Sequence, residues 1–287
     1  MKSNCPNNCC SNIVKNGFFF RTSDSRKIQR YRCQLCRKQF SQATNSPCYL
    51  QKKRRINELV FKLLASGVSM RRCALILNIH RTTVKRKLNF LARRARQNQR
   101  ILLDSLKERP VSHLQFDDLI TIEHTKLKPL SVSIAVDAKK RTILATEISQ
   151  IPAFGHLAAL SKKKYGFRKS HHKEGLKRMF EKIKDIIASN SLIESDQHKL
   201  YPGLVREYFK CAHHKRYKGG RGCVAGQGEL KKLHRDPLFT LNHTCAMFRA
   251  NINRLIRKTW CTTKRPDMLQ NHIDLYTDFH NRILIKQ

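Results

Sequence analysis

Two adjacent carboxylates stand among short apolar runs in a chain that is otherwise strongly basic. Asp117 and Asp118 lie in His113–Gln150, whose runs rich in Ile, Val and Thr predict three successive strands, the last two paired as a hairpin. Pro129 and the polar tip Ala138–Arg141 are expected to separate these strands. A carboxylate near a core is costly unless a metal ion or a basic group neutralises it. The segment therefore predicts a metal-binding strand or, alternatively, two solvated residues at a sheet edge.

Paired cysteines near the start of the chain form the second set of residues suited to chemistry. Cys33 and Cys36 have the spacing of a zinc knuckle, and Cys5 can pair with Cys10, which we prefer, or with Cys9. A segment this small has little core of its own and needs a metal to fold. We therefore expect a zinc ribbon that binds Zn²⁺ through Cys5, Cys10, Cys33 and Cys36, the competing interpretation being four unrelated cysteines.

Composition narrows the partners. The chain has 59 Lys and Arg against 20 Asp and Glu, a net charge of +39 over 287 residues. Such a chain repels itself unless a polyanion is near, which favours a nucleic acid. No run of about 20 apolar residues and no signal-peptide core is present, so we expect a soluble, cytoplasmic protein that does not bind membranes. Without a secretion signal, the cysteines are interpreted as metal ligands and buried thiols rather than disulfides.

The segment after the cysteines has a helical pattern. A helix from Ile56 to Leu63 ends before Gly67, and Ser69 is expected to cap a second helix that runs to Leu77. A third helix begins at Arg81, with Val84 and Leu88 facing inward and Thr82, Thr83, Lys85 and Lys87 facing out. This layout predicts a helix-turn-helix, with a plain three-helix bundle as the alternative. The expected DNA-binding residues are Arg81, Thr82, Thr83, Lys85 and Arg86.

The remaining elements are predicted from period and composition. A basic helical linker over Ala92–Lys107 ends at Pro110. Further along, the expected elements are a loop facing DNA (Ile151–Ser170), an amphipathic helix (Lys173–Ala188), a fourth strand (Leu192–Ser195) that leads to Asp196, a fifth strand (Glu207–His213), a long helix opened by Asn242 and running past Ile256, and a last helix (Asp267–Ile283). Gly219–Gly228 lacks the P-loop pattern and is predicted as a flexible loop that binds no nucleotide.

This order of elements predicts an α/β fold. Three strands, a helix, a strand, a helix or loop, a further strand and helices form the order of a ribonuclease H-like core, in which the first and fourth strands lie side by side. Asp117 and Asp196 would then lie together. We divide the chain into a zinc-ribbon DNA-binding head (1–50), a helix-turn-helix domain with its basic linker (51–110) and a ribonuclease H-like catalytic domain (111–287).

A family resemblance covers most of the chain. Four places carry it together: Cys5–Gly17 with Arg30–Ser41, Phe116–Asp118 with Ile134–Thr142, Ser195–Asp196 with Leu200–Tyr201, and Arg249–Thr259. The chain resembles bacterial insertion-sequence transposases of the insertion-sequence-one kind. The resemblance implies an Mg²⁺-dependent (or Mn²⁺-dependent) polynucleotidyl transferase that cleaves the DNA of the element ends and joins the freed 3′-hydroxyl to target DNA, acting as a homo-oligomer on DNA.

The resemblance also assigns candidate ligands. It makes Asp117 and Asp196 the first two metal ligands and leaves Asp118 and Asp137 as supporting acids at most. The family's third ligand is a glutamate, whereas the matching position here is Asn242, followed by His243. A related insertion-sequence family uses Asn there, so we expect a catalytic set of Asp117, Asp196 and Asn242, with Glu229 as the rival third ligand.

Two other functions compete with a transposase. An inactive, transposase-derived DNA-binding regulator would use the zinc ribbon and the helix-turn-helix but gives Asp117 and Asp196 no role. A ribonuclease H-like nuclease acting in repair or on RNA would use these carboxylates, but it explains the two DNA-binding modules ahead of them less well.

Overall fold

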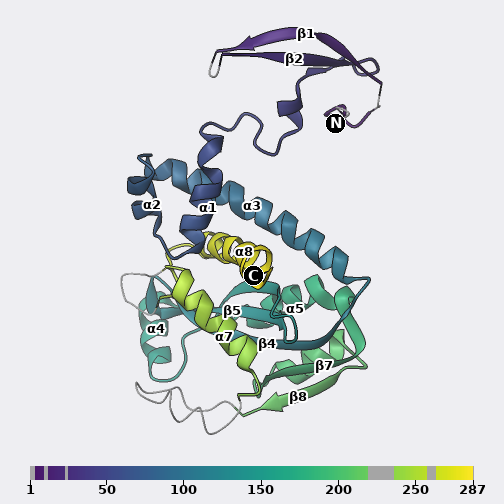
Figure 1. The fold of residues 1–287 in the computed structure, drawn as a ribbon. Coiled ribbons are helices and arrows are strands. Elements are labelled where there is room, and N and C mark those ends of the chain that lie inside the picture. Colours follow the sequence, from purple (N-terminus) through teal and green to yellow (C-terminus); the bar gives the residue numbers. More distant parts are fainter. Residues whose placement is uncertain (1–3, 10–11, 23–24, 219–235, 257–262, 287) are drawn as a thin grey trace. The chain divides into compact units, whose positions relative to one another are not determined.

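The computed structural model describes residues 4–9, 12–22, 25–218, 236–256 and 263–286. The chain forms two compact units, Met1–Asn57 and Glu58–Gln287 (Figure 1). Among the described residues, none of the helices is both long and apolar enough to cross a membrane.

The first unit is a small antiparallel sheet. Strands β1 (Ile13–Arg21) and β2 (Arg26–Cys33) form a hairpin, and the short β3 (Gln39–Phe40) pairs with the end of β2. Its core consists of Cys5, Cys33 and Phe40, with Ile13 and Tyr31 packed against them. Two 3-10 turns follow, Gln42–Asn45 and Arg54–Ile56. This core is too small to supply much stability, so a metal at its cysteines would add what burial does not.

The second unit begins with three helices, α1 (Asn57–Ala65), α2 (Met70–Ile76) and α3 (Arg81–Leu106). As predicted, the Ser69 hydroxyl caps α2 by accepting from the backbone N–H of Arg72, and Val84 and Leu88 are fully buried. Two expectations were wrong. The predicted linker is a continuation of α3, which runs unbroken for 26 residues, and Lys87 is buried rather than facing solvent.

A five-stranded mixed sheet occupies the centre of this unit, in the order β6-β5-β4-β7-β8 (Figure 1). The first three strands in sequence, β4 (Val111–Glu123), β5 (Thr125–Asp137) and β6 (Ile143–Gln150), are antiparallel neighbours, whereas β7 (Ile187–Asp196) and β8 (His213–Tyr217) are added in parallel. The first and fourth strands are therefore adjacent. Pro129 does not end a strand; it lies within β5, and the turn falls at His124, whose φ of 67° is left-handed.

Each face of the sheet has its own hydrophobic core. On one face Leu114, Phe116 and Leu144 pack against α5 (His172–Ile183) and α6 (Tyr201–Tyr208). On the other, Leu119, Ile134 and Val136 pack against α7 (Phe239–Asn251) and α8 (Pro266–Arg282). Alternate residues of one strand thus face different helices, which is what the period of two in a strand requires.

Several predicted boundaries differ from the structure. The segment expected as a loop contains a helix, α4 (Leu157–Tyr165), and α5 ends early because a 3-10 turn at Lys184–Ile186 leads directly into β7. The expected fifth strand is mostly α6, with β8 following it. Helix α7 begins before Asn242 and ends at Asn251. The Gly-rich stretch lies outside the described residues.

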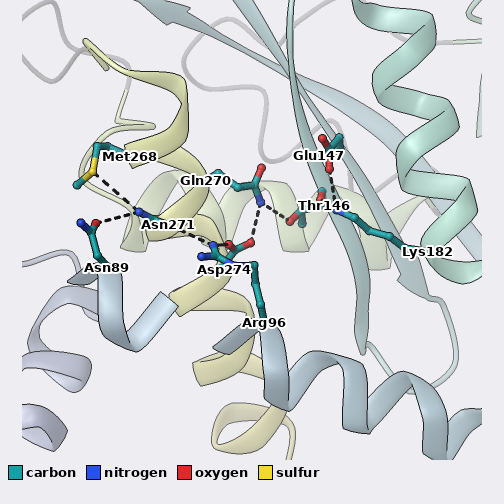
Figure 2. Close-up of polar contacts among 9 residues, drawn as sticks. All are labelled: Asn89, Arg96, Thr146, Glu147, Lys182, Met268, Gln270, Asn271 and Asp274. Carbon is teal, nitrogen blue, oxygen red and sulfur yellow. Dashed lines mark hydrogen bonds and ion pairs between the residues drawn. The ribbon is translucent and has the colours of Figure 1, made fainter. Parts of the chain in front are cut away.

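Polar contacts join α8 to α3 and to β6 (Figure 2). The Arg96 guanidinium lies 2.5 Å from the Asp274 carboxylate, which also accepts from Gln270. Asn271 donates to Asn89, and Gln270 donates to Thr146 on β6. These contacts hold α3 against α8, and α8 against the sheet, within one unit.

Candidate functional site

Four cysteine sulfurs converge in the first unit. Cys5 and Cys9 come from the first turn, Cys33 from the end of β2 and Cys36 from the turn that follows. The Sγ atom of Cys5 lies 3.4 Å from the Sγ atom of Cys9 and 3.5 Å from that of Cys36. The Sγ atoms of Cys9 and Cys33 are 3.5 Å apart. Sulfurs about 2.3 Å from one tetrahedral zinc ion would be separated by roughly 3.8 Å, so the cluster fits a zinc ribbon.

The cluster corrects one predicted ligand. Cys9 occupies the fourth corner, whereas Cys10, which we had preferred, lies outside the described residues. Contacts with the Cys36 and Cys5 sulfurs, together with burial, raise the pKa of the Cys9 thiol. A bound dication would reverse this effect by stabilising all four thiolates, so the arrangement suits a metal better than free thiols.

A second set of polar residues lies where β4 and β7 run side by side. Gln115 on β4 is opposite Glu194 on β7 in the parallel register. Asp117 and Asp196 each lie two residues further along their strands, on the same face as Gln115 and Glu194. The structure thus places Asp196, at the end of β7, near Asp117 in the middle of β4, just beyond the last paired residues of the two strands.

The surroundings of Asp117 oppose its ionisation. Burial, and then the negative charges of Asp196 and Asp118, raise its pKa to about 7, while the backbone N–H of Asp118 and the Tyr201 hydroxyl act in the opposite direction. The Tyr201 contact is long, at 3.2 Å. A bound cation would stabilise the ionised form of such a carboxylate, which is buried and has a second carboxylate beside it.

Asp118, in contrast, has its oxygens filled by protein donors. Its Oδ1 accepts from the hydroxyls of Ser131 and Ser133, each at 2.5 Å, and its Oδ2 accepts from His172 and Tyr201, each at 2.6 Å. Burial opposes its ionisation, but these donors outweigh burial and hold the pKa of Asp118 below its ordinary value. Asp118 is therefore an anchor within the fold and not a free metal ligand.

The rings of His172, His198 and Tyr201 pack against one another beside Asp118. His172 is the first residue of α5, and its pKa is raised: burial works against the charged ring, but Asp118 more than compensates. The rings of His172 and His198 lie 4.9 Å apart, as do those of His198 and Tyr201. The segment that follows Asp196 is therefore packed onto the residues that hold Asp118.

A buried glutamate, two residues before Asp196 on β7, connects β7 to β4 through hydrogen bonds. The Glu194 carboxylate accepts from Gln115 at 2.8 Å, from Tyr217 at 2.6 Å and lies 2.6 Å from the His113 ring. Although burial opposes it, these contacts lower the pKa of Glu194. Gln115 also accepts from the backbone N–H of Leu241, which fixes the start of α7 over β4.

Asn242, the predicted third ligand, lies in the first turn of α7. Its exposed amide donates to Asp236 at 2.8 Å, which leaves its carbonyl oxygen available. One turn further on, burial and then the Asp117 charge raise the pKa of the Cys245 thiol to about 12, so this part of α7 lies within the electrostatic reach of Asp117. No contact joins Asn242 to either aspartate in the described part of the chain.

Three other candidates take different positions. Asp137 closes the β5–β6 turn by accepting from the backbone N–H groups of Lys139 and Lys140, a structural role. The Nδ1 atom of His243 lies 3.0 Å from the Arg141 guanidinium. Glu229 lies outside the described residues. Among the side chains that the structure describes, only the four cysteines form a group of three or more His, Cys, Asp or Glu ligand atoms within 4.8 Å.

The predicted DNA-binding residues lie in the first turns of α3. The His80 ring accepts from the backbone N–H of Thr82 and so caps the helix. Thr83 is half-buried, and the other four are exposed, namely Arg81, Thr82, Lys85 and Arg86. The helix thus presents basic and hydroxyl groups to solvent at its N-terminal end.

Sequence reasoning missed the residues that hold the aspartates in place. Glu194 had a detectable signal, because it lies two residues before Asp196 on the same face of a strand. His172 had none, because its contact with Asp118 joins residues 54 positions apart. Tyr201 lies in a stretch that carries the family resemblance, but no local pattern indicated its contact with Asp118, 83 positions away. No protein-family model matches the chain, and no curated protein matches it.

Proposed function

We propose that this chain is a DNA transposase that cleaves and transfers strands with the help of a divalent metal at Asp117 and Asp196. The observation that carries the proposal is the difference between the adjacent aspartates. Asp118 is saturated by four protein donors, whereas Asp117 accepts only a long contact from a side chain, that of Tyr201, has a pKa raised to about 7 and lies in the field of Asp196. The sheet order agrees with the ribonuclease H-like core that we expected.

The residues at this edge suit Mg²⁺ or Mn²⁺. These ions prefer carboxylate and carbonyl oxygens, and Asp117, Asp196 and the Asn242 amide offer such oxygens from β4, β7 and α7. When bound, such a metal supplies Lewis-acid activation of the attacking oxygen and stabilises the leaving oxygen. Asn242 contributes no charge, so the site would hold metal less tightly than three carboxylates.

The surrounding residues position this set and the DNA. The Asp118–His172–Tyr201 contacts fix the backbone of β4 next to Asp117, and the Tyr201 hydroxyl orients its carboxylate. Exposed Lys199, Lys215 and Arg216 flank the end of β7 and would bind strand phosphates. The four-cysteine cluster and the α1–α3 helices would recognise the element ends. A DNA-binding regulator without catalytic activity would not need the contacts that hold Asp117 in place.

Strand cleavage tests the proposal. Purified protein is incubated with Mg²⁺ and with DNA that carries the sequences flanking its own gene, and nicked strands are mapped on a denaturing gel. Asp117→Ala and Asp196→Ala should each abolish nicking while DNA affinity stays the same or rises. Asp104→Ala, which removes an exposed acid from α3, is the matched control and should cleave normally. Equal cleavage by all four proteins would refute the assignment, and cleavage of RNA in preference to DNA would favour the nuclease.

A further inference from the structure

The segment between β6 and α5, Ile151–His171, presents aromatic side chains to solvent on both sides of α4. The Phe154 side chain is 64% exposed and that of Phe167 is 85% exposed. Each is next to a glycine with positive φ, Gly155 at 61° and Gly166 at 74°, a conformation that other residues adopt only with strain. The backbone is thus shaped to turn at the two places where these rings project.

This segment is also strongly basic. Between Ile151 and His171 it contains no Asp or Glu, and its cations are Lys162, Lys163, Lys164, Arg168 and Lys169. The three lysines of α4 are exposed, and the ammonium of Lys128 on β5 lies 4.3 Å from the centre of the Tyr165 ring. Exposed rings beside a row of cations match a strand whose bases are unpaired, because every base has a face for stacking and every nucleotide has a phosphate.

Buried contacts hold the base of this segment in place. The Ser161 hydroxyl donates to the Leu127 carbonyl at 2.7 Å, and Arg168 pairs with Glu123 at 2.9 Å and donates to the Ile151 carbonyl at 3.0 Å. The exposed rings therefore stand on a fixed support, which lowers the entropy lost when a ligand binds them.

The position of the segment relates it to the proposed active site. His172, which contacts Asp118, follows it directly, and Glu123, which holds Arg168, lies six residues beyond Asp117 on β4. Six residues of a strand span about 20 Å. A DNA strand leaving the Asp117 region along β4 would therefore reach these rings within a few nucleotides.

We propose that Ile151–His171 binds an unpaired stretch of DNA, with Phe154 and Phe167 stacked on bases and Lys162, Lys163 and Lys164 against phosphates. The proposal rests on the proposed function, because it takes DNA as the substrate, and it adds that the DNA is opened near the cleavage position. An anionic membrane is a weaker match, because the apolar residues of α4 fill only its first turn, Leu157–Leu160, which is short for a helix that inserts its apolar face into a membrane.

Binding of full-length protein to short fluorescein-labelled DNA, without added Mg²⁺, tests the proposal. Phe154→Ala and Phe167→Ala together should weaken binding to a mixed-sequence single strand at least fivefold, since stacking contributes about 1 to 3 kcal/mol per base, and should change binding to the matching duplex less than twofold. Replacing Lys162, Lys163 and Lys164 with Ala should weaken both and reduce the single-strand salt slope by about 2.

Matched substitutions at Phe167 separate stacking from simple apolar contact. Phe167→Trp should keep single-strand affinity, whereas Phe167→Leu should lose it as Phe167→Ala does, and all should fold normally because the position is exposed. Equal single-strand affinity for the wild type and the double Phe variant overturns the proposal. A double Phe variant that loses binding to anionic vesicles but keeps binding to DNA overturns it as well. Because no cleavage is measured, a catalytically inactive protein that still shows the single-strand effect would contradict only the proposed function.

Discussion

The His172 ring and the Asp118 carboxylate form a buried ion pair, with Nε2 2.6 Å from Oδ2. This pair connects the start of α5 to the middle of β4, directly beside Asp117. Because Asp118 also accepts from Ser131, Ser133 and Tyr201, the pair is the centre of a network that spans two strands and two helices. It explains why two adjacent aspartates in one strand take different roles.

Removing Asp118 should therefore destabilise the fold strongly. Asp118→Ala leaves the His172 ring and three hydroxyl groups buried without their acceptor, and breaking a buried pair typically costs about 3 to 5 kcal/mol. Urea unfolding followed by circular dichroism measures the effect. Asp104→Ala, at an exposed carboxylate, should change the free energy of unfolding by less than about 0.5 kcal/mol. A small loss for Asp118→Ala would mean that the network does not hold β4.

Asp117→Asn should stabilise the protein more at about pH 8 than at about pH 5. A pKa raised from 3.8 to about 7 means that the folded state binds a proton more tightly than the unfolded state, so stability falls as pH rises through this window. The amide stays neutral and removes this loss, by up to about 4 kcal/mol at the higher pH. Thermal unfolding at the two pH values, with no divalent ion added, measures it. Equal effects at both would show that Asp117 ionises freely.

The fold was more predictable from sequence than the support of the site. Ile, Val and Thr runs located β4, β5 and β6, because short runs of β-branched residues bounded by turn residues are a local signal of strands. Pro129 misled the strand boundary, since proline is tolerated where its missing N–H costs no pairing. The stretch around Tyr208 was assigned to a strand because its aromatic residues suit strands, whereas packing against α5 makes it the end of α6.

The candidate site was only partly predictable. Asp117 and Asp196 could be expected to lie near each other because β4 and β7 are neighbouring parallel strands. The choice between Cys9 and Cys10 depended on the exact path of a turn, which cysteine spacing alone does not determine. The partners of Asp118 depend on contacts between distant segments, which no local pattern records.

The cysteine cluster should hold one Zn²⁺ per chain. Cys9→Ser should lose this zinc, whereas Cys10→Ser, one residue away, should keep it, because the Cys9 sulfur is the one that lies 3.5 Å from that of Cys33. Metal content is measured by mass spectrometry after dialysis of the full-length variants. Zinc lost from Cys10→Ser and kept in Cys9→Ser would reverse the assignment.

The N-terminal turns of α3 should recognise DNA. Thr83→Ala with Lys85→Ala should weaken binding to the element ends by about 1 to 3 kcal/mol, because exposed groups on this helix can reach base edges or phosphates. Lys87→Ala, at a buried position of the same helix, should act on the free energy of unfolding instead. Fluorescence anisotropy with DNA and thermal unfolding distinguish the two. Unchanged affinity in the double variant would move recognition to the cysteine-bearing unit.

Binding of Mn²⁺, a spectroscopic substitute for Mg²⁺, tests the central claim most directly. Electron paramagnetic resonance counts the bound ion on the full-length protein at about pH 8, where Asp117 is largely ionised. We predict that Asp117→Ala and Asp196→Ala each lose the site, that Asn242→Ala weakens it by about tenfold, and that Glu229→Gln leaves it intact. Wild-type Mn²⁺ affinity in both aspartate variants would contradict the account, and loss in Glu229→Gln with none in Asn242→Ala would make Glu229 the third ligand.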